Sequence, residues 1–595
     1  MAETTIRKPN QTEREKCIMK NVTITLLSVL AFAIAPLAQT APGKPNILFI
    51  ICDDLNDFIG CYGGHPQAKT PNMDRLAERG VLFENAAVQI PVCLPSRSSM
   101  IYGLYPQKNQ YFDTLTPLFT QGPYVKERLY SYIEFFKDND YAVYGTGKVY
   151  HNLMAPKDTW VDKDGNSIYS VPPNWGPFPG NATMPKGSMT KDGREQYAKD
   201  PAFAGMTNMW SLSSTANSIG KRHPNRPANH NHGTTYASLD EKPEGDGYDG
   251  WYLYDKPYRY VSEDDRDPMP DEMSAEYVSN LLKKKFDKPF QITVGFVRPH
   301  TPLYAPKKYF DLYPIETLKL SEGIKANDID DICEDLGRNQ AKPKIKYGSH
   351  GFDEYNILMS HDDGQGLLEF TQAYLACISY VDAQLGKVLD ALDASPYADN
   401  TLIVFTSDHG YHIGEKEQIF KGSLWEESLR VPFIVAGPGV KKGARCTQPI
   451  SWIDIFPTLL DYAGFDGNPN AKFDGPKLDG FSIRPLLENP QGDWEGPDVS
   501  LSALGQNVNE RTIEYPDRWA QHYSVRSERY RYIRTNSGQE ELYDCERDPH
   551  CWKNIADNPE VQAIKESLHA QMKELVGKPV AFDVSKAWRN PNPGE

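Results

Sequence analysis

The sequence has few cysteines for its length. Nine cysteines are spread over 595 residues, and none of them form a C-x-x-C pair. Such sparse cysteines cannot build a framework of disulfides. Cys545 and Cys551 are near enough in sequence to form a disulfide in an oxidising compartment, and the sequence alone leaves this question open.

The chain also lacks an excess of positive charge. It has 64 Lys and Arg against 80 Asp and Glu, which gives a formal net charge of −16. This balance argues against nucleic acid as a partner. Local basic residues, rather than the field of the whole protein, must therefore attract any anionic substrate. With no internal repeat or low-complexity tract, the length suits one large domain and a smaller one.

No apolar run is long enough to predict a membrane span with suitable flanks. Val22 to Ala38 is apolar and follows Met19-Lys20, which is typical of a secretory signal peptide. We therefore interpret residues 1–41 as a leader whose true start is Met19, and no cysteine follows it to carry a lipid. The prediction is a bacterial periplasmic or secreted protein without stable membrane insertion.

The first strand-like run of the chain ends in two carboxylates. Asn46 to Ile51 is continuously apolar and predicts a buried strand of a parallel sheet, and Asp53 and Asp54 follow it. Open α/β sheets bind ligands at the carboxyl ends of their strands. A divalent cation would relieve the repulsion between adjacent carboxylates. The alternative is a solvated loop start.

Three further strand-like runs also end in polar clusters. Together the four clusters predict a site along one edge of a sheet, because coincidence does not comfortably explain four of them. Lys421 comes thirteen residues after Asp408 of the last cluster. The three runs and their clusters are Tyr141–Gly147 with Lys148 and His151, Phe290–Val297 with Arg298 and His300, and Thr401–Thr406 with Asp408 and His409.

The Lys148 and His151 pair is spaced to share one face of a helix. Taken alone, this pair fits a surface position at least as well as a functional one. His300 is different, because prolines at 299 and 302 stiffen the loop that holds it.

A cysteine lies at the start of a predicted helix. In Pro91-Val92-Cys93-Leu94-Pro95-Ser96-Arg97, Pro95 fits the first turn, and Gly103 fits the helix end. The N–H groups and dipole of a helix N-terminus favour an anion. Cys93 is therefore either a low-pKa thiolate nucleophile or a buried thiol near a helix start.

The segment Cys-x-Pro-Ser-Arg, followed by a short apolar run and glycine, resembles the signature of type I sulfatases of the alkaline phosphatase-like superfamily. The order of the motifs is most similar to the iduronate-2-sulfatase branch and its bacterial relatives. The resemblance implies an α/β fold with a large, mostly parallel central sheet between helices. It also implies that a formylglycine-generating enzyme or an anaerobic sulfatase maturase converts Cys93 to formylglycine, whose hydrate is the nucleophile.

The same resemblance implies a role for each polar residue. Calcium would be held by Asp53, Asp54, Asp408 and His409, with an oxygen of the modified Cys93; many sulfatases have Asn at the position of His409. Lys148 and Lys421 would hold the sulfate oxygens, and Arg97 with Lys148 would stabilise the nucleophile. His300 would protonate the leaving oxygen, and His151 would take a proton from the hydrate. Arg298 is a candidate for a substrate carboxylate or second sulfate, and Tyr411 and His412 either face the substrate or have structural roles.

The end of the chain predicts a smaller unit. Tyr523–Arg534 and Glu541–Asp544 suggest antiparallel strands, and Asn558-Pro559 begins an amphipathic helix. This pattern resembles the sheet-plus-helix subdomain of sulfatases. We expect a catalytic domain at 42–488 and a C-terminal subdomain at 489–595.

The predicted function is hydrolysis of sulfate esters on a sulfated glycan. Two other hypotheses remain open. One is a phosphodiesterase or phosphonate monoester hydrolase, which shares the cysteine motif. The other is a secreted glycan-binding protein that has lost catalysis.

Overall fold

The computed structural model describes residues 44–109, 129–151, 155, 158–180, 236–241, 250–253, 256–336, 349–359, 362–504 and 521–577. The predicted signal peptide lies outside these residues. Among the residues described, no helix is both long and apolar enough to cross a bilayer.

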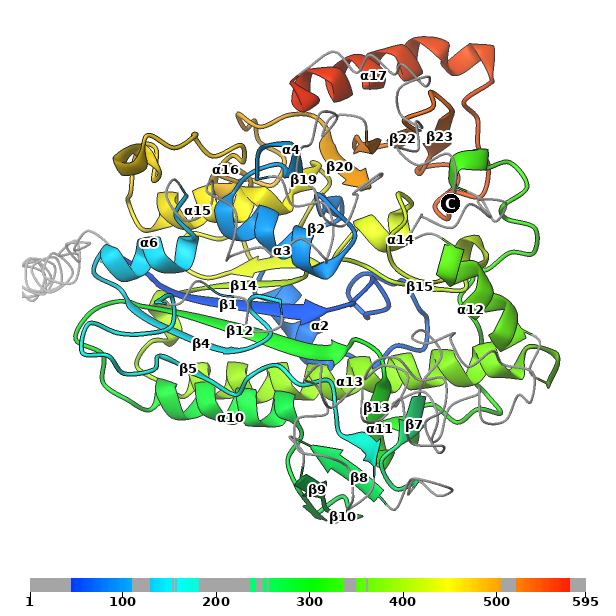
Figure 1. Cartoon of the computed structure of the whole chain (residues 1–595). Coiled ribbons are helices and arrows are strands. Elements are labelled where there is room, and N and C mark those ends of the chain that lie inside the picture. Colours follow the sequence, from blue (N-terminus) through cyan, green and yellow to red (C-terminus); the bar gives the residue numbers. More distant parts are fainter. Residues whose placement is uncertain are drawn as a thin grey trace, which may run out of the picture. The chain divides into compact units, whose positions relative to one another are not determined.

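An eight-stranded sheet forms the centre of the fold (Figure 1). Only β17 runs against its neighbours, so the predicted mostly parallel sheet is confirmed. In spatial order the strands are β18 (Ala444–Cys446), β2 (Gly80–Phe83), β17 (Phe433–Ala436), β14 (Thr401–Ser407), β1 (Asn46–Asp53), β12 (Phe290–Pro299), β4 (Ala142–Gly147) and β5 (Tyr169–Ser170).

The strands β1, β12, β14 and β4 are the four that the sequence predicts. Their apolar runs suit the middle of the sheet because both faces of these strands are covered. β1 pairs in parallel with β14 up to Cys52 and Ser407 and with β12 up to Asp53 and Pro299. This register aligns the strand ends, so the polar residues that follow each strand emerge at one edge.

Helices cover both faces of the sheet (Figure 1). Side chains of β1 alternate between two cores: Leu48, Ile50 and Cys52 belong to one, and Ile47, Phe49 and Ile51 to the other. Helices α2 (Pro71–Glu78), α10 (Pro270–Leu282) and α13 (Gln365–Asp393) pack in the first core. Helices α3 (Cys93–Tyr102), α6 (Tyr132–Asp138) and α15 (Ile455–Tyr462) pack in the second.

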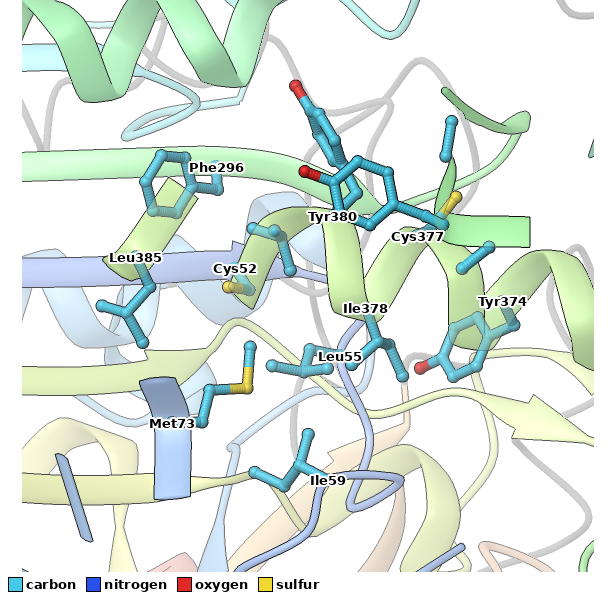
Figure 2. Close-up of a cluster of buried hydrophobic side chains, with 14 of the residues drawn as sticks. Cys52, Leu55, Ile59, Met73, Phe296, Tyr374, Cys377, Ile378, Tyr380 and Leu385 are labelled. Carbon is cyan, nitrogen blue, oxygen red and sulfur yellow. The ribbon is translucent and has the colours of Figure 1, made fainter. Parts of the chain in front are cut away.

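Helix α13 is the longest element of the first core. Its apolar face repeats at helical spacing, and the residues on that face are buried: Tyr374, Ile378, Val381, Leu385, Val388 and Leu392. Figure 2 shows Ile378 and Leu385 of this helix with Leu55, Met73 and Cys52 of the elements against which it packs. Apolar contacts of Cys52 and Leu55 therefore hold the chain on both sides of Asp53 and Asp54.

A four-stranded antiparallel sheet with one helix forms near the end of the chain, as predicted. The strands are β20 (Ser500–Leu504), β21 (His522–Arg526), β22 (Tyr530–Arg534) and β23 (Glu540–Asp544), and α17 (Gln562–Val576) packs on them. Ile90, Val92 and Ile453 share their core. The described residues from Pro45 onward form one compact unit. The boundary at 488/489 follows α16 (Arg484–Glu488) and stays a prediction.

Shorter elements connect these layers. They are β3 (Ala86–Ala87), α4 (Pro106–Asn109), β6 (Phe178–Gly180), β7 (Tyr236–Ser238), β8 (Gly250–Leu253), β9 (Lys256–Tyr258), β10 (Tyr260–Ser262), β11 (Asp265–Arg266), β13 (Leu303–Ala305), α11 (Lys307–Phe310), α12 (Ser349–Met359), β15 (His412–Ile413), β16 (Ile419–Phe420), α14 (Glu426–Leu429) and β19 (Ile450–Ser451).

Candidate functional site

Helix α3 places Cys93 at the edge of the central sheet. Cys93 is the first residue of the helix, and Gly103 ends it with a φ of 64°, a left-handed conformation that glycine adopts without strain. The Cys93 side chain is only 3% exposed. The predicted helix and its ends are therefore confirmed, with the cysteine buried at the N-terminus.

Three carboxylates meet beside this helix. Asp53 ends β1, and Asp408 follows β14 directly. Asp54 has a φ of 65°, which turns the chain sharply so that consecutive aspartates both belong to the cluster. Its backbone N–H donates to Asp408 Oδ1 at 3.3 Å. All three side chains are fully buried.

Each carboxylate has a buried cation beside it. Lys148 donates to Asp53 and Lys421 donates to Asp54. The Nε of Arg97 donates to Asp408 Oδ2 at 2.8 Å. The cluster thus balances three negative charges with three positive ones, which is the arrangement that makes buried ions tolerable.

The three carboxyl groups differ in their pKa. Burial opposes the ionisation of Asp53, but Lys148 and the other nearby cations outweigh it and hold the pKa of Asp53 well below its usual range. Burial raises the pKa of Asp54 to about 7, although Lys421 opposes the change. Burial likewise raises the pKa of Asp408 to about 6, against the effect of Arg97.

The Cys93 thiol lies within this cluster. Lys421 Nζ and His409 Nε2 are both 3.1 Å from its Sγ, and Asp53 Oδ1 is 3.4 Å away. Burial, followed by the charge of Asp53, raises the pKa of Cys93 to about 12. The hypothesis of a low-pKa thiolate is therefore wrong, because burial and carboxylates outweigh the helix N-terminus and the lysines. The unmodified residue is a buried neutral thiol.

Two more histidines belong to the site. His300 Nε2 lies 3.8 Å from Asp54 Oδ2. His151 follows β4 in a bent segment, so the predicted helical face shared with Lys148 is wrong, and Lys148 is fully buried rather than at the surface. Burial lowers the pKa of His300 and of His151 well below the usual value, with Lys148 and Lys421 adding to the effect. Both rings are neutral near pH 7 in this charge environment.

Arg298 does not face a substrate. Its buried guanidinium donates to the backbone carbonyls of Tyr304, His300, Trp175 and Gly176, at distances from 2.8 to 3.3 Å. These bonds occupy the planar donor fork. The hypothesis that Arg298 binds a substrate carboxylate or sulfate is therefore corrected: it ties the His300 loop to a segment more than 120 residues earlier.

That earlier segment brings Trp175 into the site, a residue that the sequence analysis missed. The Trp175 ring contacts the His300 ring edge to face with centroids 5.9 Å apart, and Lys148 Nζ lies 5.3 Å from the indole centroid. Asp271 is a second missed residue, since its carboxylate accepts from the backbone N–H groups of Val297 and Arg298. A tryptophan in an irregular, proline-rich stretch gives no signal of such a contact.

Tyr411 and His412 have structural roles in the folded chain. The Tyr411 ring stacks on Tyr374 with an interplanar angle of 21°. His412 Nε2 lies 2.7 Å from Ser423 Oγ, and both residues are buried. Of the two readings left open by the sequence, the structural one is supported.

The site has the ligand types for a metal ion. Two overlapping groups of side chains have ligand atoms that all lie within 4.8 Å of one another. One group is Asp53, Asp54, Cys93 and His300, and the other is Asp53, Cys93, Asp408 and His409. Asp54 Oδ2 is buried and makes no hydrogen bond. Carboxylate oxygens are the ligands that a hard cation such as Ca²⁺ prefers. The residues present therefore fit a divalent cation.

Comparison with known proteins identifies the family. The family model described as Sulfatase matches residues 45–465. This chain belongs to the sulfatase family. A second model, for the C-terminal part of N-sulphoglucosamine sulphohydrolase, matches residues 414–578 of this sulfatase. The predicted family is confirmed, and the protein is a sulfuric ester hydrolase.

Relatives match three quarters or more of the sulfatase chain. A protein named Sulfatase from Formosa agariphila is 31% identical over 538 residues, covering 89% of this chain and 87% of the relative. An ulvan-active sulfatase of the same organism is 26% identical, with 94% and 86% covered. The iduronate 2-sulfatase of Mus musculus is 29% identical, with 75% and 74% covered.

Solved structures show the same fold. The phosphonate monoester hydrolase of Agrobacterium radiobacter superposes with a TM-score of 0.60 at 21% identity, covering 89% of this chain and 95% of that one. A structure in complex with D-glucosamine-2-N,6-O-disulfate gives a TM-score of 0.58 at 18% identity, with 90% and 99% covered. The predicted fold class is confirmed.

Replacing Arg298 with lysine tests whether its four carbonyl contacts position His300. Lysine keeps the charge but loses the planar fork. A shift of about 1 Å in a reacting group can cost on the order of 10²-fold. We expect kcat for a sugar sulfate to fall by roughly 10–100-fold, and kcat for an activated aryl sulfate to fall much less.

The control is Arg484→Lys, at an exposed ion pair with Asp461, which should change neither rate. If Arg298→Lys lowers both rates in the same proportion, the residue only maintains the fold.

Proposed function

We propose that this sulfatase removes sulfate esters from a sulfated carbohydrate, using Cys93 in its formylglycine form and a calcium ion. One observation carries the proposal: Cys93 lies within a buried cluster of three carboxylates and three cations. The names of relatives support the substrate class, since they include an ulvan-active sulfatase and iduronate 2-sulfatases. We further propose maturation by a formylglycine-generating enzyme or anaerobic maturase, and a periplasmic or secreted location.

Each proposed group supplies chemistry that the unmodified side chains lack. Formylglycine hydrate carries two hydroxyls on one carbon, one to attack sulfur and one to allow sulfate to leave. Calcium, held by Asp53, Asp54, Asp408 and His409, would act as a Lewis acid toward sulfate oxygens. The buried Asp54 Oδ2 that makes no hydrogen bond supports this ligand set.

The lysines and Arg97 would stabilise negative charge around sulfur. Lys421 Nζ is 3.1 Å from Cys93 Sγ, which stands in for the nucleophilic position. Lys148 lies on the Asp53 side of the same position. Preorganised cations in a site closed to water stabilise developing charge far more than they would in solvent. Lys148 and Lys421 would hold the sulfate oxygens, and Arg97 with Lys148 would favour the ionised nucleophile.

The two histidines would move protons. His300 would donate to the sugar oxygen as it leaves, and His151 would take a proton from the second hydroxyl of the hydrate. Their lowered pKa values mean that the free site holds both rings neutral. An anionic sulfate ester brought next to His300 would favour its protonated form, so the substrate itself would prepare the general acid.

We expect Cys93→Ala to abolish turnover of a sulfated oligosaccharide while the fold remains intact. The residue supplies the nucleophile, and a thiol-to-methyl change removes little volume. Released sulfate and circular dichroism measure the two effects. Cys93→Ser should be active only in a host whose maturase accepts serine. Wild-type-like turnover by the alanine variant would contradict the proposal.

Calcium should raise the melting temperature, because a ligand that binds only the folded state stabilises it by mass action. Protons compete for the same oxygens, since the pKa of Asp54 is about 7 and that of Asp408 about 6 without metal. Below pH 7 these groups are increasingly protonated, so more calcium should be needed for the same effect. Differential scanning fluorimetry over pH 5–8 measures this shift.

Asp54→Asn serves as the matched variant for the calcium titration and should respond weakly at every pH. Elemental analysis of the purified protein completes the test. No bound metal, together with unchanged melting and activity after exhaustive chelation, would rule out the site.

His300→Ala should separate chemistry from binding. A sugar alkoxide is a poor leaving group and needs the proton, whereas an aryl oxide does not. We expect losses of roughly 10²–10⁴-fold on the glycan and far smaller ones on the aryl sulfate. His151→Ala should lower the turnover of both substrates. Equal losses on the two substrates for His300→Ala would show that His300 only positions the sulfate.

A second function has some support. A multifunctional alkaline phosphatase superfamily protein of Trinickia caryophylli is 25% identical over 543 residues, covering 88% of this chain. The alternative substrates are phosphate diesters or phosphonate monoesters, the hypothesis that the shared cysteine motif leaves open. Comparing kcat/KM for matched sulfate and phosphate esters, followed by a screen of defined sulfated oligosaccharides, decides between them.

A further inference from the structure

A second group of reactive side chains lies away from the catalytic cluster. The Sγ atoms of Cys545 and Cys551 are 3.2 Å apart at the end of β23. Cys551 is buried and Cys545 is partly exposed. We propose that these two residues form a disulfide bond in the mature protein.

The backbone brings the two cysteines together within seven residues. The N–H groups of Arg547 and Asp548 both donate to the carbonyl of Asp544, at 3.1 and 2.8 Å. The Cys551 N–H then donates to the Asp548 carbonyl at 2.9 Å. A disulfide has an S–S length of about 2.05 Å, so the sulfur atoms must approach by about 1.2 Å. Side-chain rotation can provide most of this movement.

An oxidant can reach the pair from one side. Cys545 lines a cavity of about 770 Å³, together with Arg526, Arg529 and Pro549. The hydrogen bond with Cys551 lowers the pKa of Cys545 below that of a free thiol, and Arg526 adds to the effect. The accessible cysteine is therefore also the better nucleophile for thiol–disulfide exchange.

The chemistry balances with a disulfide as the oxidant, either a small molecule such as glutathione disulfide or a protein disulfide. The Cys545 thiolate attacks one sulfur of the oxidant and expels the other as a thiolate, which leaves a mixed disulfide. Cys551 then loses its proton and attacks Cys545 Sγ, releasing the second thiol. The pair loses two protons and two electrons, and the oxidant becomes two thiols.

A metal ion is the competing occupant, because Glu426 completes a group of three ligand atoms with the two sulfurs. Glu426 is already committed to other partners. Arg526 Nε and Arg531 Nη2 lie 2.5 and 3.1 Å from its two oxygens, and Arg430 lies 3.7 Å away. The positive charge of the three guanidinium groups offsets the negative charge of the Glu426 carboxylate. The same positive charge repels a metal cation.

The disulfide would fix a loop that contacts the segment leading to Lys421. The carbonyl of Cys551 accepts a hydrogen bond of 2.6 Å from the buried Nζ of Lys416, which also pairs with Asp328 at 3.0 Å. Lys416 precedes Lys421 by five residues. Oxidation would thus hold the far end of the 545–551 loop against the segment that leads to Lys421.

The first test uses the wild-type protein. The purified chain is equilibrated with glutathione disulfide, alkylated without reduction and digested. The peptides containing Cys545 and Cys551 should be found joined and unlabelled, with the mass of both minus two hydrogens. They should separate and take up label after reduction. Cys446 should take up label in either case once the chain is unfolded. Full labelling of both Cys545 and Cys551 before reduction would overturn the proposal.

The second test uses melting temperatures with and without dithiothreitol. The short loop predicts a fall of a few degrees on reduction of the wild type. The melting temperatures of Cys545→Ser, Cys551→Ser and the double variant should not change with dithiothreitol. The double variant should lose no more in melting temperature than either single variant does. Cys61→Ser, which replaces a partly exposed thiol elsewhere, should respond to dithiothreitol as the wild type does. A wild-type melting temperature that is independent of dithiothreitol would contradict the bond.

Discussion

The pairing of buried charges at the edge of the central sheet is the constraint on which the site depends. Asp53, Asp54 and Asp408 are removed from water, and each would be costly to ionise alone. Lys148, Lys421 and Arg97 make the cluster tolerable, and each comes from a different part of the chain. The parallel register of β1 with β14 brings the carboxylates together, and β4, which pairs in parallel with β12, places Lys148 at the same edge. Sheet geometry and electrostatics therefore specify the site together.

Around this cluster, backbone carbonyls and buried side chains fix the orientation of the reacting groups. Tyr374 of α13 donates to the Asp54 carbonyl at 2.6 Å and accepts from the Asn56 N–H at 3.0 Å, so the turn after β1 is attached to the longest core helix. Arg298 does the same for the His300 loop. In both cases, a buried side chain that would not itself contact the substrate fixes the backbone of a residue in the site.

Much of this arrangement could be predicted from the sequence. Continuous apolar runs identify β1, β4, β12 and β14, and the polar residues after them form the cluster because parallel strands end at one edge. Helix α3 could likewise be predicted, because Pro95 fits its first turn and Gly103 its end. These features depend on local pattern, which a single sequence records.

What could not be predicted depends on contacts between distant segments. Trp175 reaches His300 from an irregular stretch, and Arg298 binds carbonyls, which have no signature in the sequence. The error over the Cys93 thiolate has the same origin. A helix N-terminus is visible in the sequence, whereas the burial and the facing carboxylates that raise the pKa to about 12 arise only in the folded chain.

The burial of Cys93 also restricts when the proposed modification could take place. At 3% exposure, with Lys421 and His409 both 3.1 Å from it, its sulfur is closed to any macromolecular catalyst once the chain has folded. An enzyme that alters this thiol must therefore meet the segment while it is still extended. The time between synthesis and closure of the sheet edge would then determine what fraction of the molecules ever becomes competent. A folding rate, rather than an affinity, would limit the yield of active protein.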